Sequence, residues 1–214
     1  MEPFTLLLDF IIHLDQHLSL LIQTYGLWVY AILFLVVFLE TGLVITPFLP
    51  GDSLLFAAGT FAAIGALDLA TLFIALSLAA IAGDALNYWI GYHMGPRVFR
   101  RTRLFKKEYL ERAEHFYEKH GRKTIFIARF LPIIRTFAPF VAGMGKMQYR
   151  RFAAYNVLGG VTWVALFLLG GFFFGNIPVV RENFALAITG IIIVSFVPPV
   201  IGYARHRKVQ SKNR

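Results

Sequence analysis

The sequence has no cysteine, which excludes disulfide bonds, thiol catalysis and thiolate metal sites. Charged residues are also scarce, at 15% of the 214 residues, whereas 57% of the residues are hydrophobic. The mean hydropathy of +0.64 lies outside the range of ordinary soluble domains and is typical of an integral membrane protein. Because each helical crossing needs about 20 apolar residues, the length suits one membrane domain with a few crossings and no large soluble domain.

Motifs for cofactor or metal chemistry are absent from the sequence. It contains neither a Walker loop nor an HExxH zinc motif, and its six histidines are scattered. We therefore expect no cofactor, and an enzyme such as a lipid phosphatase is a weak alternative. The net charge of +9 comes mostly from two basic clusters, residues 97–123 and 205–214. Such clusters mark the cytoplasmic side of a membrane and attract anionic lipids, so nucleic acid is not an expected partner.

Hydrophobic periodicity divides the chain into membrane segments and interfacial helices. Residues 1–26 predict an amphipathic helix at the membrane surface, and residues 205–214 predict a basic cytoplasmic tail. The membrane domain between them, residues 27–204, is expected to contain a re-entrant hairpin (27–66), a crossing (69–95), a cytoplasmic amphipathic helix (97–123), a second re-entrant hairpin (124–145) and two further crossings (152–175 and 183–204). The predicted fold class is an all-α polytopic membrane protein.

Prolines and glycines interrupt both predicted hairpins, and we expect a turn or hinge at Pro47, Pro50, Gly51, Pro132, Pro139 and Gly143. Basic residues flank segment 124–145 on both sides, which predicts that it enters and leaves the membrane from the cytoplasm. Counting crossings back from a cytoplasmic C-terminus makes the first hairpin enter from outside and places the N-terminus outside. The alternative is a complete crossing by residues 27–48, which places the N-terminus inside.

Two hairpins that enter from opposite faces form the arrangement of an inverted-repeat transporter. Segment 47–51 (PFLPG) is similar to segment 139–143 (PFVAG), and the two following crossings end in the pattern GxxxG at 91–95 and 171–175. These matches are short, and chance similarity between apolar segments also produces such matches. The inverted repeat is therefore a hypothesis at this point.

Four ionisable residues lie within the interrupted segments, namely Glu40 and Asp52 in the first and Arg129 and Arg135 in the second. An unpaired arginine at the bilayer centre costs roughly 2.5–3.5 kcal/mol on insertion scales, so these charges should face one another or water. We expect a shared polar cavity near the membrane midplane. The interruption at Pro132 allows the two arginines to converge although they are six residues apart.

The residue types indicate anion binding coupled to protonation. A guanidinium group stays charged and its planar fork of donors matches phosphate, so Arg129 and Arg135 are the candidate substrate-binding residues. Partly buried carboxylates exchange protons near neutral pH, so Glu40 and Asp52 are candidates for proton coupling. Asp84 joins them because it lies within the first crossing. Alternatively, the charges form an ionic lock that holds the hairpins together.

Further polar residues lie on the predicted crossings. Asn87 follows Asp84 by three residues, and Asn156, Gly159 and Trp163 lie on one face of the second crossing. Polar and small residues at helical spacing form hydrogen bonds and close contacts between membrane helices. We therefore assign Asn87, Asn156 and Trp163 to helix packing.

At these residues the sequence resembles the DedA family, also called the SNARE-associated Golgi or VTT-domain family. The resemblance covers residues 27–174 and rests on Glu40 with Pro47 and the Pro50-Gly51-Asp52 turn, Gly83-Asp84 followed by NYWIG at 87–91, RFxPxxR at 129–135, Ala142-Gly143, and Asn156 with Gly159 and Trp163. It implies a bacterial inner-membrane protein with two re-entrant hairpins that is needed for envelope homeostasis. The essential acidic and arginine positions of the family correspond to Glu40, Asp52, Arg129 and Arg135. Tyr92-His93 departs from the family pattern, in which a basic residue often follows the glycine.

The resemblance also implies movement of lipids between leaflets and dependence on the proton motive force. Undecaprenyl phosphate and phosphatidylethanolamine are substrates ascribed to bacterial members, and eukaryotic relatives resemble scramblases. Our leading hypothesis is a proton-linked undecaprenyl phosphate flippase, not an enzyme, whose partners are membrane lipids, protons and, in a homo-oligomer, further copies of the chain. The alternatives are a phosphatidylethanolamine flippase or scramblase, a proton-coupled exporter of small cations, and a membrane organiser without transport activity.

Overall fold

The computed structural model describes residues 14–43, 51–101, 121–174 and 177, and this part of the chain is helical without any strand. The helices are α2 (Leu14–Tyr25), α3 (Trp28–Gly42), α4 (Gly51–Ala63), α5 (Leu69–Arg101), α7 (Thr124–Ala128), α8 (Pro132–Met144) and α9 (Tyr149–Phe174), with a 3₁₀ turn (Gly121–Lys123) before α7. The predicted all-α fold class is confirmed. Several predictions lie outside the described residues, namely residues 1–13 of the predicted segment 1–26, segments 183–204 and 205–214, most of 97–123, and both Pro47 and Pro50.

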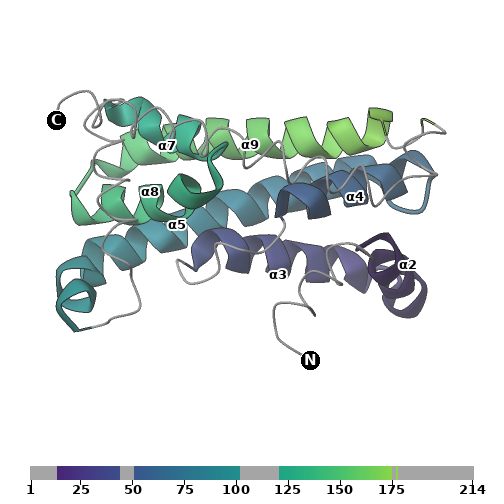
Figure 1. The fold of residues 1–214 in the computed structure, drawn as a ribbon, viewed down its shortest axis with the longest axis horizontal. Coiled ribbons are helices and arrows are strands. Elements are labelled where there is room, and N and C mark those ends of the chain that lie inside the picture. The colour runs from purple at the N-terminus through teal and green to yellow at the C-terminus, as the bar shows by residue number, and fades with distance from the viewer. Residues whose placement is uncertain (1–13, 44–50, 102–120, 175–176, 178–214) are drawn as a thin grey trace, which may run out of the picture.

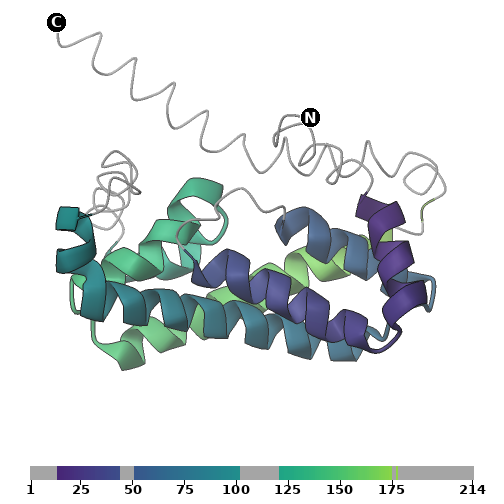
Figure 2. The same ribbon diagram turned by 90° about the horizontal axis from the view of Figure 1, so that it is seen from below.

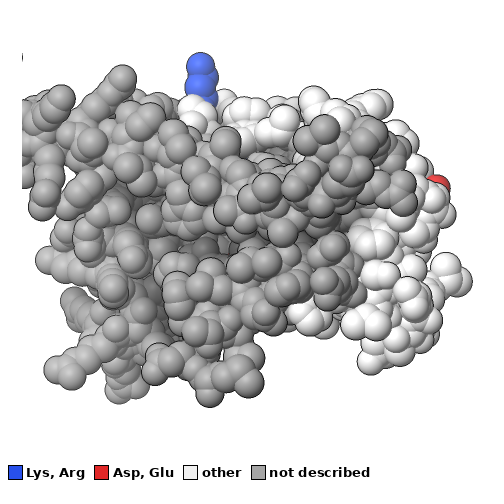
Figure 3. Space-filling model, turned by 45° about the vertical axis from the view of Figure 1, so that its right-hand side comes forward, with Lys and Arg blue, Asp and Glu red and all other residues white. Residues whose placement is uncertain are grey.

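The two long helices, α5 and α9, run in opposite directions along the longest axis of the molecule (Figure 1). Their segments Leu69–His93 and Tyr149–Phe174 are long and apolar enough to cross a membrane. They correspond to the predicted crossings 69–95 and 152–175, although α5 continues to Arg101 and α9 already begins at Tyr149. Both helices expose large apolar side chains, such as Ile74 at 60% and Leu166 at 58%, which suits contact with lipid tails. On the face shown in Figure 3, the visible described surface is almost entirely uncharged, with charge only near its edges.

The shorter helices form two pairs that reach the middle of the bundle from opposite ends (Figures 1 and 2). The pair α3 and α4 comes from the end where α5 begins, and the pair α7 and α8 comes from the other end. The members of each pair separate, because α3 packs on α5 and α4 on α9, whereas α7 packs on α9 and α8 on α5. The inner ends of both pairs therefore meet between the two long helices.

Glycines bring α4 and α9 into backbone contact. A Cβ atom on Gly59 would overlap backbone atoms of Leu168 and Phe172, and a Cβ atom on Gly171 would overlap the carbonyl group of Phe56. Small residues of this kind allow close approach of membrane helices. Gly59 and Gly171 therefore fix the crossing point of α4 on α9.

The crossing of α8 on α5 has the same form. A Cβ atom on Gly143 would overlap the Tyr88 carbonyl group and the Tyr92 amide, and a Cβ atom on Gly91 would overlap the Phe140 carbonyl group. Gly143 lies in the last turn of α8, where it permits this crossing, and its carbonyl group accepts a hydrogen bond from the Lys146 amide at 2.9 Å in the turn that ends the helix. The two crossings place four glycines in equivalent positions.

Proline affects α8 at two positions with different results. The chain is interrupted at residues 129–131, and Pro132 is the first residue of α8, where the missing amide donor costs nothing. Pro139 lies inside α8, which continues through it without the predicted break. Pro139 has no amide to donate to the Arg135 carbonyl group, and the close packing of α8 on α5 offsets this lost hydrogen bond.

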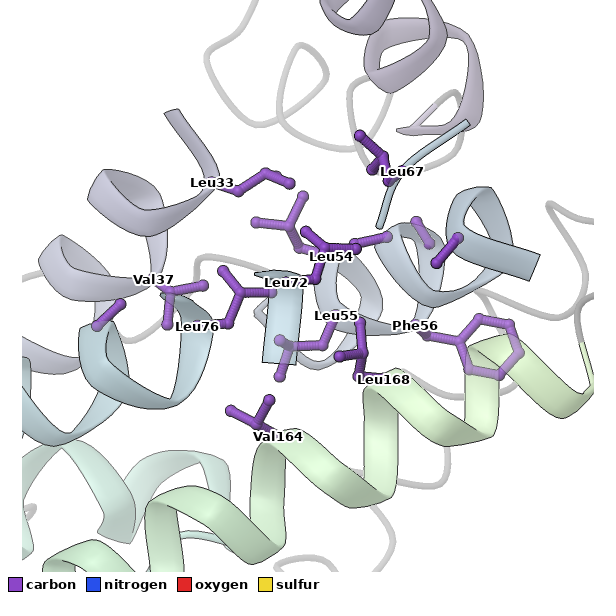
Figure 4. Close-up of a cluster of buried hydrophobic side chains, with 14 of the residues drawn as sticks. Leu33, Val37, Leu54, Leu55, Phe56, Leu67, Leu72, Leu76, Val164 and Leu168 are labelled. Atoms are coloured by element: carbon purple, nitrogen blue, oxygen red, sulfur yellow. The ribbon is translucent and has the colours of Figure 1, made fainter. Parts of the chain in front are cut away.

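A hydrophobic cluster holds α2, α3, α4, α5 and α9 together in the part of the bundle where α5 begins. Its members labelled in Figure 4 are Leu33, Val37, Leu54, Leu55, Phe56, Leu67, Leu72, Leu76, Val164 and Leu168. The turn after α4 is fixed by Asp68, whose Oδ1 accepts hydrogen bonds from the amide and hydroxyl of Thr71 at 2.7 and 2.6 Å. The Thr71 hydroxyl and amide lower the pKa of Asp68 below its usual 3.8. The hydrophobic cluster fixes the position of α4 against α5 and α9, and therefore also the position of the first turn of α4.

Candidate functional site: buried ion pairs between the long helices

Arg135 joins the two interrupted segments. It lies in the first turn of α8, where its Nη1 donates to Asp52 Oδ1 at 2.7 Å and its Nη2 donates to Glu40 Oε1. Glu40 comes from the last turn of α3 and Asp52 from the first turn of α4. The side chains of Glu40, Asp52 and Arg135 are only 1%, 15% and 11% exposed. In this Arg135 cluster one guanidinium fork is shared by two carboxylates.

Two neighbours hold the Arg135 cluster in place. Trp163 of α9 donates from Nε1 to Asp52 Oδ1 at 2.9 Å, and its ring centre lies 5.4 Å from the Arg135 guanidinium carbon. The Gly51 amide donates to Glu40 Oε1 at 3.2 Å. The N-terminus of α4 thereby places partial positive charge beside the Glu40 carboxylate. Trp163 therefore belongs to the site, in addition to the packing role predicted for it.

Gly51 has a steric role that the predicted turn does not describe. It is the first residue of α4, and a Cβ atom there would overlap the carboxylate group of Glu40. A hydrogen at this position leaves the space that the carboxylate occupies. Gly51 is therefore required for close approach between α4 and the end of α3.

Arg129 forms a second, separate cluster. Its Nη2 donates to Asp84 Oδ2 at 2.5 Å, to Asn156 Oδ1 at 2.6 Å and to the Ala80 carbonyl at 3.2 Å. Asn156 in turn donates from Nδ2 to the Ile81 carbonyl at 2.9 Å. The side chains of Arg129 and Asp84 are 4% and 6% exposed. This Arg129 cluster (Arg129, Asp84 and Asn156) ties the end of α7 to both long helices.

Glycines of α9 provide the surface on which Arg129 lies. A Cβ atom on Gly159 would lie 3.2 Å from Arg129 Cδ, and a Cβ atom on Gly160 would lie 3.5 Å from the guanidinium carbon. Asn156, which the sequence assigned to packing, does join α9 to α5 through the Ile81 carbonyl and is in addition a direct partner of the arginine. An amide in the middle of an apolar crossing was the sequence signal for this role, because such a group needs a polar partner at that depth.

Asn87 connects the helices around the two clusters. Its Nδ2 donates to the Thr136 carbonyl of α8 at 2.8 Å and to the Thr41 carbonyl of α3 at 3.3 Å. The predicted role of Asn87 in helix packing is confirmed. Through it, α5 fixes the relative positions of the helices that carry Glu40 and Arg135.

Both clusters face one small cavity near the middle of the long helices. The cavity has a volume of about 10 Å³ and is lined by Glu40, Thr41, Asp84, Arg129, Arg135, Thr136 and Trp163. Such a volume holds about one water molecule, so a phosphate headgroup does not fit unless the ion pairs open. At 1.5 Å per residue, Asp84 lies about 22 Å from Leu69 and about 14 Å from His93 along the apolar part of α5. The site is therefore distant from both ends of this segment.

The sequence predicted that four charges share one cavity, and the structure shows how these charges are paired. Arg135 contacts both Glu40 and Asp52, whereas Arg129 contacts Asp84. Asp52 contacts Arg135 without lining the cavity itself. Three carboxylates thus face two guanidinium groups in this part of the structure, and a proton on one carboxylate would make the set neutral.

Helices that are long and apolar enough to cross a bilayer, with ion pairs buried between them, define a helical membrane protein with a central polar site. The model of the VTT domain matches residues 49–173. Protein DedA of Escherichia coli (strain K12) is 54% identical over 216 residues, which cover 99% of each chain. The chain therefore belongs to the DedA family of VTT-domain membrane proteins.

Other relatives agree with this membership. An uncharacterized membrane protein of Mycobacterium tuberculosis (strain H37Rv) is 42% identical over 175 residues, which cover 80% of this chain and 77% of the relative. Inner membrane protein YqjA of Escherichia coli (strain K12) is 35% identical over 157 residues, or 70% of this chain and 69% of the relative. No solved structure matches the chain. The predicted family is confirmed, and so is the membrane location.

Proposed function

We propose that the protein is a proton-motive-force-linked flippase that moves undecaprenyl phosphate between the leaflets of a bacterial inner membrane, with its C-terminus in the cytoplasm. The observation that carries the proposal is Arg135, whose fork of donors is buried between the long helices and held by two carboxylates. The same fork matches a phosphate monoester, which accepts hydrogen bonds through equivalent oxygens. Lipids and protons are then the partners, and the cycle contains no chemical step and needs no cofactor.

In the proposed cycle, phosphate and carboxylates compete for the same arginine. An incoming phosphate displaces Glu40 and Asp52 from Arg135, and a displaced carboxylate takes up a proton because an unpaired charge is costly away from water. Loss of the proton on the other side of the membrane restores the ion pairs and releases the lipid. Asp84 takes part in the same way when its pair with Arg129 opens.

We further propose that α3–α4 and α7–α8 are re-entrant hairpins related by an inverted repeat. The equivalent glycine crossings support this, because Phe56–Gly59 packs on α9 as Phe140–Gly143 packs on α5. This relation aligns segment 140–143 with segment 56–59 and differs from the PFLPG and PFVAG match in the sequence. Rocking of one pair against the other would open the small central cavity to either face in turn.

Three other functions use parts of the same site. Phosphatidylethanolamine carries a phosphate and also an ammonium group that a displaced carboxylate would bind, so a phosphatidylethanolamine flippase or scramblase is the second candidate. A proton-coupled exporter of small cations would use the carboxylates alone. A membrane organiser without transport activity would use both clusters as an ionic lock. A homo-oligomer stays a prediction under each of these functions.

The first prediction concerns Arg135 in vesicles reconstituted with purified protein. Arg135→Ala should lower the rate of undecaprenyl phosphate movement about 10- to 100-fold, since a charged hydrogen-bonded contact is worth about 1.5–3 kcal/mol. A leaflet-resolved assay with undecaprenyl phosphate and phosphatidylethanolamine side by side measures this rate. Arg150→Ala, which removes an exposed arginine at the start of α9, is the matched control and should transport normally.

Unchanged undecaprenyl phosphate movement in folded Arg135→Ala protein would contradict the proposal. Movement of phosphatidylethanolamine alone would transfer the assignment to that lipid. Acid-dependent cation flux in vesicles without either lipid would favour the cation exporter.

A further inference from the structure

A second and larger cavity lies where the apolar part of α5 ends and α9 begins. It is a groove of about 380 Å³, lined by Tyr88, Trp89, Tyr92, His93, Lys146, Met147, Gln148 and Tyr149. Its volume lies within the range of about 300–1,000 Å³ that is usual for small-molecule sites. We call it the boundary groove. None of its residues belongs to the Arg135 or Arg129 cluster.

The floor of the boundary groove is fixed by Tyr88. Its hydroxyl donates to the Met147 carbonyl group, and its ring stacks on Phe152 with ring centres 4.4 Å apart. The Tyr88 carbonyl group lies directly against Gly143 of α8. A ligand would therefore meet a surface that is already formed by α5, α8 and α9.

The walls of the boundary groove are exposed aromatic side chains. Trp89 and Tyr149 are each 55% exposed, and Tyr92 is 44% exposed. Trp89 and Tyr92 lie just before His93, the last residue of the apolar segment of α5, and Tyr149 is the first residue of the apolar α9. Tryptophan and tyrosine at the end of a membrane helix lie at the level of the lipid headgroups. The open side of the groove is therefore expected to face lipid at the membrane boundary.

The charge of the boundary groove is suited to an anion. Lys146 lies exposed in the turn between α8 and α9, and no Asp or Glu occurs in residues 85–101 or 143–155. The backbone of Lys146 has φ of 51°, a left-handed conformation that is uncommon for residues other than glycine. The turn that carries Lys146 joins α8 to α9 and itself lines the groove beside α5.

We propose that the boundary groove binds the phosphate headgroup of an anionic membrane lipid, with Lys146 at the phosphate and the aromatic walls beside the first part of the lipid chains. The aromatic walls favour a lipid over free phosphate, which would leave them without a contact. This binding site does not depend on the proposed function. Its use as the position where lipids wait before they enter the central cavity does rest on that function.

Trp89 provides a probe for this site. The sequence has three tryptophans, and in a Trp28→Phe chain the other two are Trp89 in the groove and Trp163, which is 1% exposed. The full chain would be placed in nanodiscs that contain either phosphatidylglycerol or phosphatidylcholine with brominated chains. Quenching of Trp89 then gives the association of phosphatidylglycerol relative to phosphatidylcholine, and we expect phosphatidylglycerol to be preferred.

Lys146→Gly is the decisive variant, because glycine adopts the left-handed backbone without strain and only the ammonium group is lost. It should lower the preference for phosphatidylglycerol about five-fold, as expected for one lysine near a headgroup. Lys146→Arg should keep the preference. Lys123→Ala removes an exposed lysine outside the groove and should also keep it.

Three results would overturn the inference. The first is an unchanged preference in Lys146→Gly, and the second is an equal loss in Lys123→Ala, which would indicate general surface charge. The third is full displacement of brominated phosphatidylglycerol by inorganic phosphate at matched ionic strength, which would indicate a free-phosphate site.

Arg135→Ala separates this inference from the proposed function. It should lower transport as predicted above and leave the phosphatidylglycerol preference at Trp89 unchanged, since Arg135 does not line the groove. If Arg135→Ala transports normally and the preference persists, the proposed function fails and the boundary groove stands. If Arg135→Ala removes the preference, the groove is not an independent site and the inference fails.

Discussion

Single residues decide how the charges of this membrane domain are paired. Glu40 Oε1 accepts hydrogen bonds from the Arg135 side chain and the Gly51 amide, and Glu40 Oε2 has no hydrogen-bond partner among the described residues. Breaking a buried ion pair by removing one partner costs about 3–5 kcal/mol in proteins. The space for this carboxylate exists only because residue 51 has no side chain.

The second prediction therefore concerns Gly51. Gly51→Ala should lower the stability by about 1–3 kcal/mol, the usual cost of inserting a methyl group into a packed interior. In a Glu40→Ala background the same substitution should cost much less, because the overlapping carboxylate is gone. Thermal unfolding of the four proteins of this double-mutant cycle in detergent measures the coupling. Equal costs in both backgrounds would show that Gly51 does not act through Glu40.

At the residue scale, the sequence indicated which residues are buried and charged but not how they pair. Glu40, Asp52, Arg129 and Arg135 stand out because charges are rare in apolar segments. Their partners lie far apart along the chain, and the choice of Asp84 for Arg129 depends on where the end of α7 lies against the two long helices. The part that Trp163 plays depends likewise on a contact between α4 and α9.

At the scale of elements, there are two glycine crossings. One holds α4 against α9, and the other holds α8 against α5. Gly59 and Gly171 serve α4 and α9, and Gly143 and Gly91 serve α8 and α5. The approach is close enough that the carbonyl group of one helix fills the position of the missing Cβ on the other. Packing of this kind contributes most to association between membrane helices, because lipid tails supply no hydrophobic driving force.

The third prediction tests one of these crossings. Gly91→Ala should lower the thermal unfolding midpoint and reduce transport, since the added methyl group forces α5 away from α8 and shifts the helix that carries Arg135. Gly170→Ala is the matched control, because its Cβ atom would meet only Phe56 at an ordinary 3.9 Å. Gly170→Ala should therefore match the parent chain in stability and transport. A Gly91→Ala protein as stable and active as the control would contradict the proposed importance of the crossing.

The elements themselves could largely be predicted, whereas their ends and crossings could not. Apolar runs and prolines indicated α3, α4, α5, α8 and α9 because length and hydropathy determine membrane helices. The predicted break at Pro139 is absent, because contacts with α5 maintain α8 through this position, whereas the chain does turn directly after Gly143. Tertiary packing of this kind is not encoded in local spacing.

At the scale of the whole molecule, the two helix pairs have their outer ends at opposite ends of the bundle (Figure 2). Tyr30 near the start of α3 accepts a hydrogen bond from the Asp68 amide at 2.7 Å, which joins the start of α3 to the turn after α4. At the other end, Ile125 of α7 belongs to the same buried cluster as Phe152 near the start of α9. Each pair therefore begins and ends on one side.

The fourth prediction follows from this arrangement and from the absence of cysteine, which allows clean single-cysteine labelling. Thr24→Cys and Ala66→Cys should react with an impermeant maleimide from the same side of the membrane. Lys123→Cys and Gln148→Cys should react only from the opposite side. All four positions are exposed. Labelling of Thr24→Cys and Ala66→Cys from different sides would show that the first segment crosses completely and would remove the inverted repeat.

The central proposal for the whole molecule is that Arg135 exchanges its carboxylates for a lipid phosphate. The most direct test is the exchanged pair Glu40→Arg with Arg135→Glu in an Asp52→Asn parent chain, in which no carboxylate of Asp52 opposes the new glutamate. The rate of undecaprenyl phosphate movement per folded protein in vesicles is measured. An ionic lock survives such an exchange, whereas a phosphate site loses the arginine from its position on α8. We predict a folded protein with transport lowered at least about ten-fold, the loss of a single charged contact. Transport at the rate of the parent chain would contradict the account.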